Sequence, residues 1–102
     1  MSVYAQQAVA VPTSVASGAS KNISDYDGAQ TYVSMASVGT ATYHIECSPD
    51  GTTWVQIGAD VTAAVAGRAI TAHYNLVRVR CSAYTNGTPT AAVHGQRSAK
   101  IA

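Results

Sequence analysis

Residues 40–57, TATYHIECSPDGTTWVQI, decide the fold. In the first half of this stretch Tyr43, Ile45 and Cys47 alternate with polar side chains. A period of two is typical of a strand that buries one face and exposes the other. A shorter run, residues 52–57, follows the turn and is expected to return as the next strand.

The turn lies within the stretch SPDGTTW, residues 48–54, which contains the only tryptophan of the chain. Pro49 suits the second position of a type I turn and Gly51 the left-handed position after it, so a hairpin is predicted. Trp54 either packs over the end of the fold or stands out as a stacking platform for a sugar ring or a base.

Outside this stretch the pattern is again that of strands. Residues 31–38, 76–84 and 88–94 are predicted to be strands, and residues 60–72 to contain short ones. Asn86-Gly87 supplies positive φ, which predicts a second hairpin between the last two strands. With no convincing amphipathic helix, the expected fold class is all-β: an antiparallel β-sandwich or jelly roll.

The chain has 102 residues, which suits one domain. We expect an extended N-terminal arm at residues 1–20, a β-sandwich at residues 21–95 and a C-terminal tail at residues 96–102. Chain ends are normally disordered unless something holds them. The arm and tail are therefore expected to be ordered by pairing, either within the domain or with neighbouring subunits.

Charged residues make up 11% of the chain, against about 25% in an ordinary soluble domain. So little charge favours a protein that lives in an assembly. The net charge of +1 argues against a dedicated duplex-DNA binder. No signal peptide or membrane-spanning stretch is recognised, so no membrane partner is expected.

All five acidic residues precede residue 61, and all basic residues except Lys21 follow it. Interleaved strands would mix these charges in space. Otherwise the molecule would be polar from end to end, which suits heterologous contacts.

No residue pattern indicates catalysis, and neither a metal nor a cofactor is expected. Cys47 and Cys81 fall on apolar positions and are predicted to be buried thiols that could face each other across the core. Neither has a zinc-ligand spacing. His44 and Glu46 share one strand face without further ligands, and the chain has no nucleophile elbow.

Arg78 and Arg80 project from one face of their predicted strand. They could pair with Glu46 or Asp60 across the sheet. Alternatively they could form, with Arg97 and Lys100, a basic strip that grips an acidic patch on a protein lattice. Nucleic acid fits this strip less well, because aromatic residues are not interleaved with the arginines.

The segment YHIECSPDGTTW, the later VRVR of residues 77–80 and AYTNGTPT of residues 83–90 together resemble a known group of proteins. These are the small β-sandwich proteins that tailed bacteriophages place on their virions, as head decoration (cement) proteins or in tail and fibre parts. The D-G-x-x-W hairpin also resembles that of discoidin-type sandwiches, which are longer.

The resemblance implies a non-enzymatic virion protein, assembled in the host bacterial cytoplasm, that binds the major capsid protein lattice and reinforces the head shell. It would act as a dimer or trimer. Besides Arg78 and Arg80, the residues expected to contact the partner lie in the arm and the tail: Val3, Tyr4, Val9, Val11, Arg97, Lys100 and Ile101.

Two other functions remain open at this point. One is a carbohydrate-binding or adhesion module of a tail or fibre, with Trp54, Tyr84 and Asn86 near the hairpin ends as ligand-binding residues. The other is a structural component of the tail or neck that has no ligand.

Overall fold

The computed structural model describes residues 2–26 and 31–98, and within these residues it contains strands and no helix. The strands are β1 (Ser2–Val9), β2 (Ala16–Ser17), β3 (Lys21–Asn22), β4 (Tyr32–Ala36), β5 (Thr40–Ser48), β6 (Val55–Gln56), β7 (Val65–Ala69), β8 (Leu76–Asn86) and β9 (Thr90–Ser98). The all-β class predicted from the alternation is confirmed. No helix of the described residues could cross a membrane.

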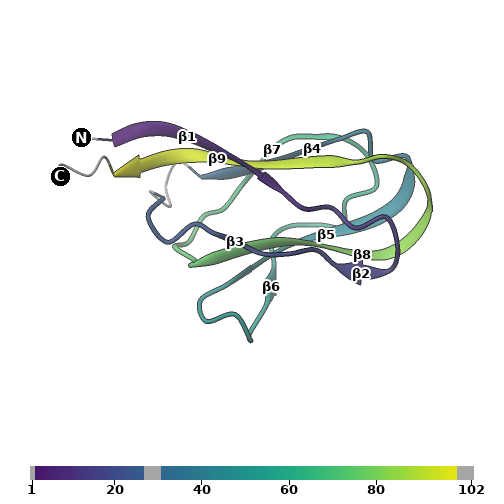
Figure 1. The fold of residues 1–102 in the computed structure, drawn as a ribbon, viewed down its shortest axis with the longest axis horizontal. Coiled ribbons are helices and arrows are strands. Elements are labelled where there is room, and N and C mark those ends of the chain that lie inside the picture. Colours follow the sequence, from purple (N-terminus) through teal and green to yellow (C-terminus); the bar gives the residue numbers. More distant parts are fainter. Residues whose placement is uncertain (1, 27–30, 99–102) are drawn as a thin grey trace.

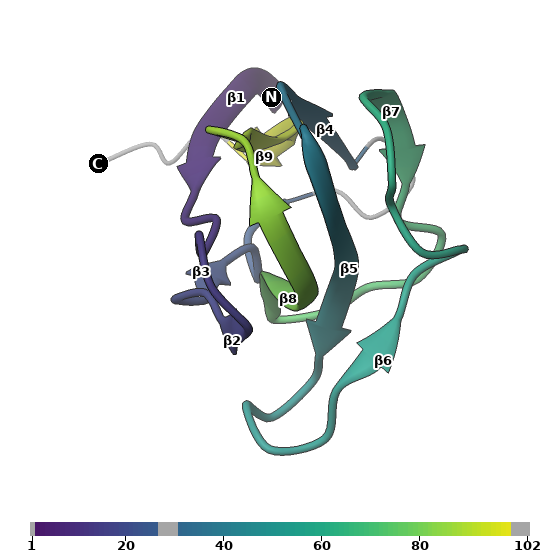
Figure 2. The same cartoon turned by 90° about the vertical axis from the view of Figure 1, so that its right-hand side faces the viewer.

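The strands form two antiparallel sheets that lie one over the other (Figures 1 and 2). Sheet A has four strands in the order β1-β9-β4-β7. Sheet B has five strands, in the order β2-β8-β5-β6 with β3 also paired to β8. The longest pairing of sheet B joins β5 to β8, the two strands with the clearest alternation in the sequence.

The core lies between the two sheets and is built from the apolar phase of each strand. β5 contributes Tyr43, Ile45 and Cys47, all with 0% of their surface exposed. The Tyr43 hydroxyl donates a hydrogen bond to the carbonyl oxygen of Pro12 at 2.9 Å, so the phenol is buried without an unpaired polar group. Sheet A supplies Val33, Met35 and Val93 from the opposite side, among others.

The two cysteines are free and buried, as the sequence predicts. Burial raises the pKa of the Cys47 thiol to about 12, which makes it unreactive at neutral pH. However, Cys47 pairs with Val77 and Cys81 with Tyr43, all within sheet B. Both thiols therefore belong to the same inner face, and the expectation that they face each other across the core is wrong.

The prediction of a hairpin at Asn86-Gly87 is also wrong. β8 belongs to sheet B and β9 to sheet A, so the chain crosses between the layers here instead of turning back beside itself. Gly87 does adopt positive φ, at 128°. A Cβ there would lie 2.7 Å from the carbonyl oxygen of Val38, so glycine is needed for the crossing to pass close to the neighbouring loop.

Residues 2–9, which the sequence assigns to an arm, form strand β1. β1 pairs with β9 over its whole length, from Ser2 opposite Ser98 to Val9 opposite Ala91. The ends were expected to be ordered by pairing either within the domain or with neighbouring subunits. The described residues show pairing within the chain. Residues 96–98 of the expected tail continue β9, whereas Lys100 and Ile101 lie outside the described residues.

Candidate functional site

The outer face of sheet B carries a cluster of charged and polar side chains. Because side chains alternate along a strand, the residues of β5 and β8 that do not enter the core point outward together. Glu46 is 7% exposed and accepts hydrogen bonds from Nε of Arg78 at 2.9 Å and Nε of Arg80 at 3.0 Å. The two arginines are therefore paired across the sheet, the first of the two alternatives that the sequence left open.

This triplet also shows how the uneven charge distribution is resolved. The acid comes from the first 60 residues and the bases from the last 42, and strand pairing brings them into contact. Burial, the largest single influence, raises the pKa of Glu46, but the hydrogen bonds and positive charges of Arg80 and Arg78 together outweigh it and hold that pKa below its ordinary value. Glu46 is therefore ionised at neutral pH.

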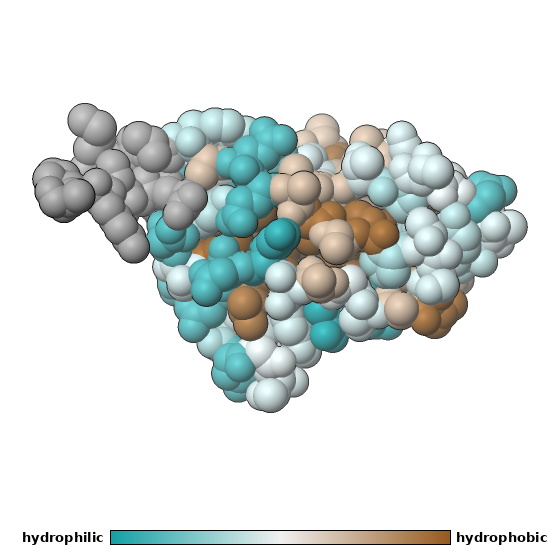
Figure 3. Space-filling view, in the orientation of Figure 1, coloured by the Kyte–Doolittle hydropathy of each residue, from teal (hydrophilic) through white to brown (hydrophobic). Residues whose placement is uncertain are grey.

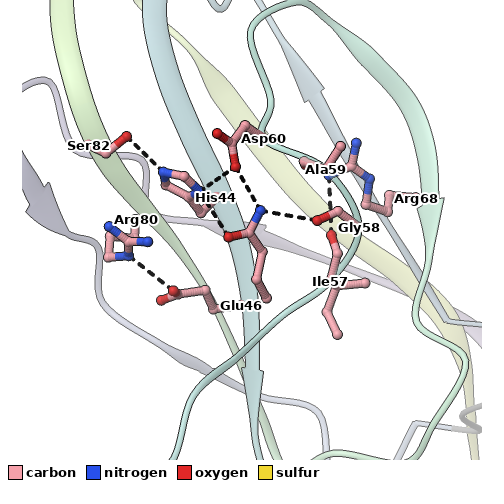
Figure 4. A network of polar contacts seen from close by, with 10 residues as sticks. His44, Glu46, Ile57, Gly58, Ala59, Asp60, Arg68, Arg80 and Ser82 are labelled. Carbon is pink, nitrogen blue, oxygen red and sulfur yellow. Dashed lines mark hydrogen bonds and ion pairs between the residues drawn. The ribbon is translucent and has the colours of Figure 1, made fainter.

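Beside this triplet lies a second set of polar contacts, centred on His44 (Figure 4). Nδ1 of His44 lies 3.0 Å from Oδ1 of Asp60 and 3.1 Å from Oε1 of Gln56, which are both acceptors. Nε2 lies 2.7 Å from Oγ of Ser82. With its proton on Nδ1, a neutral imidazole satisfies all three contacts, accepting from the Ser82 hydroxyl.

The contacts from Ser82 through His44 to Asp60 have the order of a Ser-His-Asp triad. The Asp60 side chain, however, is 57% exposed. None of the three residues lines the groove on the outer face of sheet A or the smaller one around Thr42 and Ala83. We therefore interpret these contacts as structural: they hold the segment after β6 against sheet B. Sequence reasoning missed this arrangement, because Ser82 and Asp60 carry no local motif.

Trp54 lies half-buried at the rim of the same face. The guanidinium carbon of Arg78 sits 3.9 Å from the centroid of the Trp54 ring, a cation–π contact. One face of the indole is therefore covered by the chain's own arginine. This geometry favours rim packing over an open stacking platform.

Tyr84 and Asn86 are at the other end of sheet B. The Tyr84 hydroxyl donates to the carbonyl oxygen of Gly87 at 2.6 Å, and Oδ1 of Asn86 accepts from the backbone N–H of Thr40 at 3.2 Å. Trp54 follows the opposite end of β5, roughly 20 Å away along the strand. The structure therefore does not bring these three ligand-binding candidates together.

The turn between β5 and β6 is held by its own side chains. Oδ1 of Asp50 accepts from the backbone N–H groups of Thr53 at 2.8 Å and Thr52 at 2.9 Å, and Oγ of Ser48 accepts from that of Gly51 at 2.8 Å. Gly51 has the predicted positive φ, 86°. The bonds from Thr53 and Thr52 lower the pKa of Asp50 to about 2.

This turn makes stability depend on pH. The unfolded Asp50 carboxyl has its ordinary pKa of 3.8, so the folded state gains stability above that pH and loses it as the pH falls through about 2. We expect the urea midpoint of the protein to fall between about pH 5 and about pH 2. Asp50→Asn, which keeps the acceptor but does not titrate, should show a smaller fall. An equal fall in both proteins would contradict this role.

The outer face of sheet A is hollowed into a shallow groove of about 500 Å³. Its lining is mostly small and uncharged, and includes Gln6, Ala8, Ser34, Ala66, Ala92 and His94. These residues come from β1, β9, β4 and β7, whose register places their outward side chains in adjacent rows. The groove is a consequence of small side chains on a twisted sheet.

Two tyrosines and a histidine border this groove. The Tyr4 hydroxyl lies 2.7 Å from Nδ1 of His94, and the Ser34 hydroxyl lies 2.9 Å from Nε2. The Tyr32 ring stacks on the imidazole with 4.7 Å between centroids. His94 appeared isolated in the sequence, because its neighbours come from other strands.

The predicted partner-contacting residues fall in different environments. Tyr4 is 58% exposed and open to a partner, whereas Val9 is 4% exposed and belongs to the core. Val11 is half-buried against the core. Figure 3 shows hydrophobic surface gathered over the segment that follows β1. Val3 and Arg97 lie in paired strands, and their side chains are not described.

Comparison with known proteins gives no relative: no protein-family model, curated protein or solved structure matches this chain. Within the described residues, no group of three or more His, Cys, Asp or Glu side chains is placed to hold a metal ion.

Proposed function

We propose that the chain is a non-enzymatic virion structural protein of a tailed bacteriophage, a decoration (cement) protein that binds the major capsid protein lattice and reinforces the head shell. The resemblance of its turns and strands to such proteins motivates this function. The observation that carries it furthest is the order in which the strands pair.

A jelly roll is one long antiparallel ribbon rolled up on itself, so its first strand pairs with its last, its second with its second last, and so on inward. If β2 and β3 are taken as one interrupted strand, this chain has the same nested order. β1 pairs with β9, β2 and β3 with β8, β4 with β7, and β5 with β6. We therefore infer a jelly-roll sandwich, an architecture used by viral capsid proteins and also by lectin domains and cupins.

The surface chemistry supports an assembly role. Arg78 and Arg80 are both paired with Glu46, which offsets one of their two positive charges, so these residues do not form a free basic strip. What remains for a partner is mostly small, uncharged surface, as on the outer face of sheet A. Such a surface suits many modest contacts, which several copies around a symmetry axis would multiply into avidity.

The structure leaves Tyr4 as the exposed aromatic among the predicted contact residues. We expect Tyr4→Ala to lower affinity for undecorated capsids by about tenfold, because truncated aromatic anchors commonly cost more than about 1 kcal/mol of binding. Sedimentation of labelled protein with purified shells measures the bound fraction, and imaging gives its position.

Trp54→Ala is the matched control, because the wild-type Trp54 ring is half-buried and covered by Arg78 and so is not expected to contact a shell. It should bind shells like the wild type. A wild-type protein that does not bind any shell but gives a glycan-array signal abolished by Trp54→Ala would overturn the decoration function in favour of the adhesion module.

A further inference from the structure

Each sheet has two edge strands, and an edge strand offers unpaired backbone N–H and C=O groups to any strand that approaches it. Natural proteins protect such edges by keeping them short, bulged, charged or covered. The edge strands here are β1 and β7 in sheet A, and β6 and the pair β2 and β3 in sheet B.

Three of these edges are protected. β6, β2 and β3 have two residues each, which is too short to template another strand. β7 has a register shift against β4 and carries Arg68, whose guanidinium donates to the carbonyl oxygens of Ile57 and Ala59. These contacts hold the segment after β6 beside β7.

The edge of β1 has none of these protections. It is eight residues long, SVYAQQAV, with no charged residue, proline or glycine. Its register with β9 is continuous, with no bulge. Among the described residues no second strand pairs with it.

Among the described strands, only β9 pairs with the outer half of β1. β4 covers β9 only from Thr90 to His94, whereas β1 and β9 stay paired as far as Ser2 and Ser98. Within the described strands, this end of the sheet is therefore a two-stranded ribbon of β1 and β9 (Figure 1). An isolated two-stranded ribbon is marginally stable in water, and a third strand would stabilise it.

We propose that the free edge of β1 pairs with β1 of a second copy, antiparallel across a two-fold axis, so that two four-stranded sheets become one continuous sheet. Self-pairing fits this sequence because no like charges would meet across the axis, only uncharged side chains such as the exposed Tyr4, Gln6 and Ala8. This inference deepens the proposed function, on whose self-association it rests.

Sedimentation velocity over a range of concentrations tests the pairing. The wild type should show a reversible dimer. Gln6→Lys places a positive charge on each copy at the paired edge, and should weaken the dimer by at least about tenfold. Ala66→Lys is the matched control: it adds the same charge at an exposed position of β7, the opposite edge of the same sheet, and should dimerise like the wild type.

Engineered cysteines give a second measurement. The native thiols of Cys47 and Cys81 are 0% and 1% exposed, so they should not interfere. At least one of Tyr4→Cys, Gln6→Cys and Ala8→Cys should form an intermolecular disulfide on mild oxidation, whereas Ala66→Cys should not. Circular dichroism checks that each variant is folded.

Self-association and shell binding can fail separately. A wild type that stays monomeric at every concentration, or a dimer that Ala66→Lys weakens as much as Gln6→Lys, overturns the β1 pairing even if the protein binds shells. A dimer sensitive to Gln6→Lys supports the pairing even if no shell is bound, in which case the decoration function alone fails.

Discussion

A chain that lacks residues 2–9 will not fold cooperatively. These residues are strand β1, which pairs with β9 along its whole length and places Val9 in the core. Their removal takes one strand from a four-stranded sheet and exposes the apolar surface beneath it. The free energy of unfolding of a domain of this size is only about 5–15 kcal/mol. We expect the loss of a whole strand and its core contacts to exceed this free energy, so that the folded state is lost. Urea unfolding followed by circular dichroism should give no sigmoidal transition.

Tyr4→Ala serves as the control for this deletion, because its side chain is exposed on the same strand. It should unfold cooperatively, with a midpoint close to that of the wild type. If the truncated chain instead unfolds with the wild-type midpoint, residues 2–9 are an arm that lies outside the folding unit, as the predicted division at residue 20 implies.

Replacing Glu46 by alanine should lower the free energy of unfolding by about 2 kcal/mol. The carboxylate is largely buried and is the shared partner of Arg78 and Arg80, so its loss leaves two guanidinium groups unpaired on the sheet. Breaking a fully buried pair costs about 3–5 kcal/mol. We expect less here because the arginine side chains are 20% and 35% exposed.

The same substitution has a pH signature. The folded Glu46 has a lowered pKa, so its contribution is present above the unfolded value of 4.5 and is lost as the pH falls through the folded value. The stability difference between wild type and Glu46→Ala should therefore narrow in acid. A difference that persists unchanged in acid, or none at neutral pH, would show that the ion pairs contribute nothing. Glu46→Gln, which keeps the shape and an acceptor, should lie between the two.

Strand positions and buried faces could be predicted because they depend on local pattern. The alternation around Tyr43 and Val79 places apolar side chains on one side of a strand, wherever the strand lies in the sheet. The turn at Asp50 was predictable for the same reason, since Ser48 and Asp50 bond to backbone groups within a few residues.

The error at Asn86-Gly87 shows where local pattern ends. Positive φ lets the chain turn sharply, but it does not specify whether the next strand returns to the same sheet or enters the other one. Here the nine residues of β9 pair with β1 and β4, strands far away in the sequence. Those pairings decide the direction of the chain, and a two-residue signal contains no information about them.

The candidate site was predicted in the same partial way. The pairing of Arg78 and Arg80 with Glu46 was foreseeable, since the three residues share the outward phase of two strong strands. The contacts of His44 with Asp60 and Ser82 were not foreseeable, nor were those of His94 with Tyr4. Each joins segments whose spacing depends on strand register.

By itself, the sequence determined the all-β class and which side chains of the clearly alternating strands enter the core, because a strand's two faces are set by neighbouring residues. Only the tertiary structure decided which strands are neighbours. The segment that was predicted to be an arm is an edge strand, and the chain crosses between the two sheets where a hairpin was predicted. Strand pairing is long-range, and the backbone hydrogen bonds that fix it are nearly the same for every sequence.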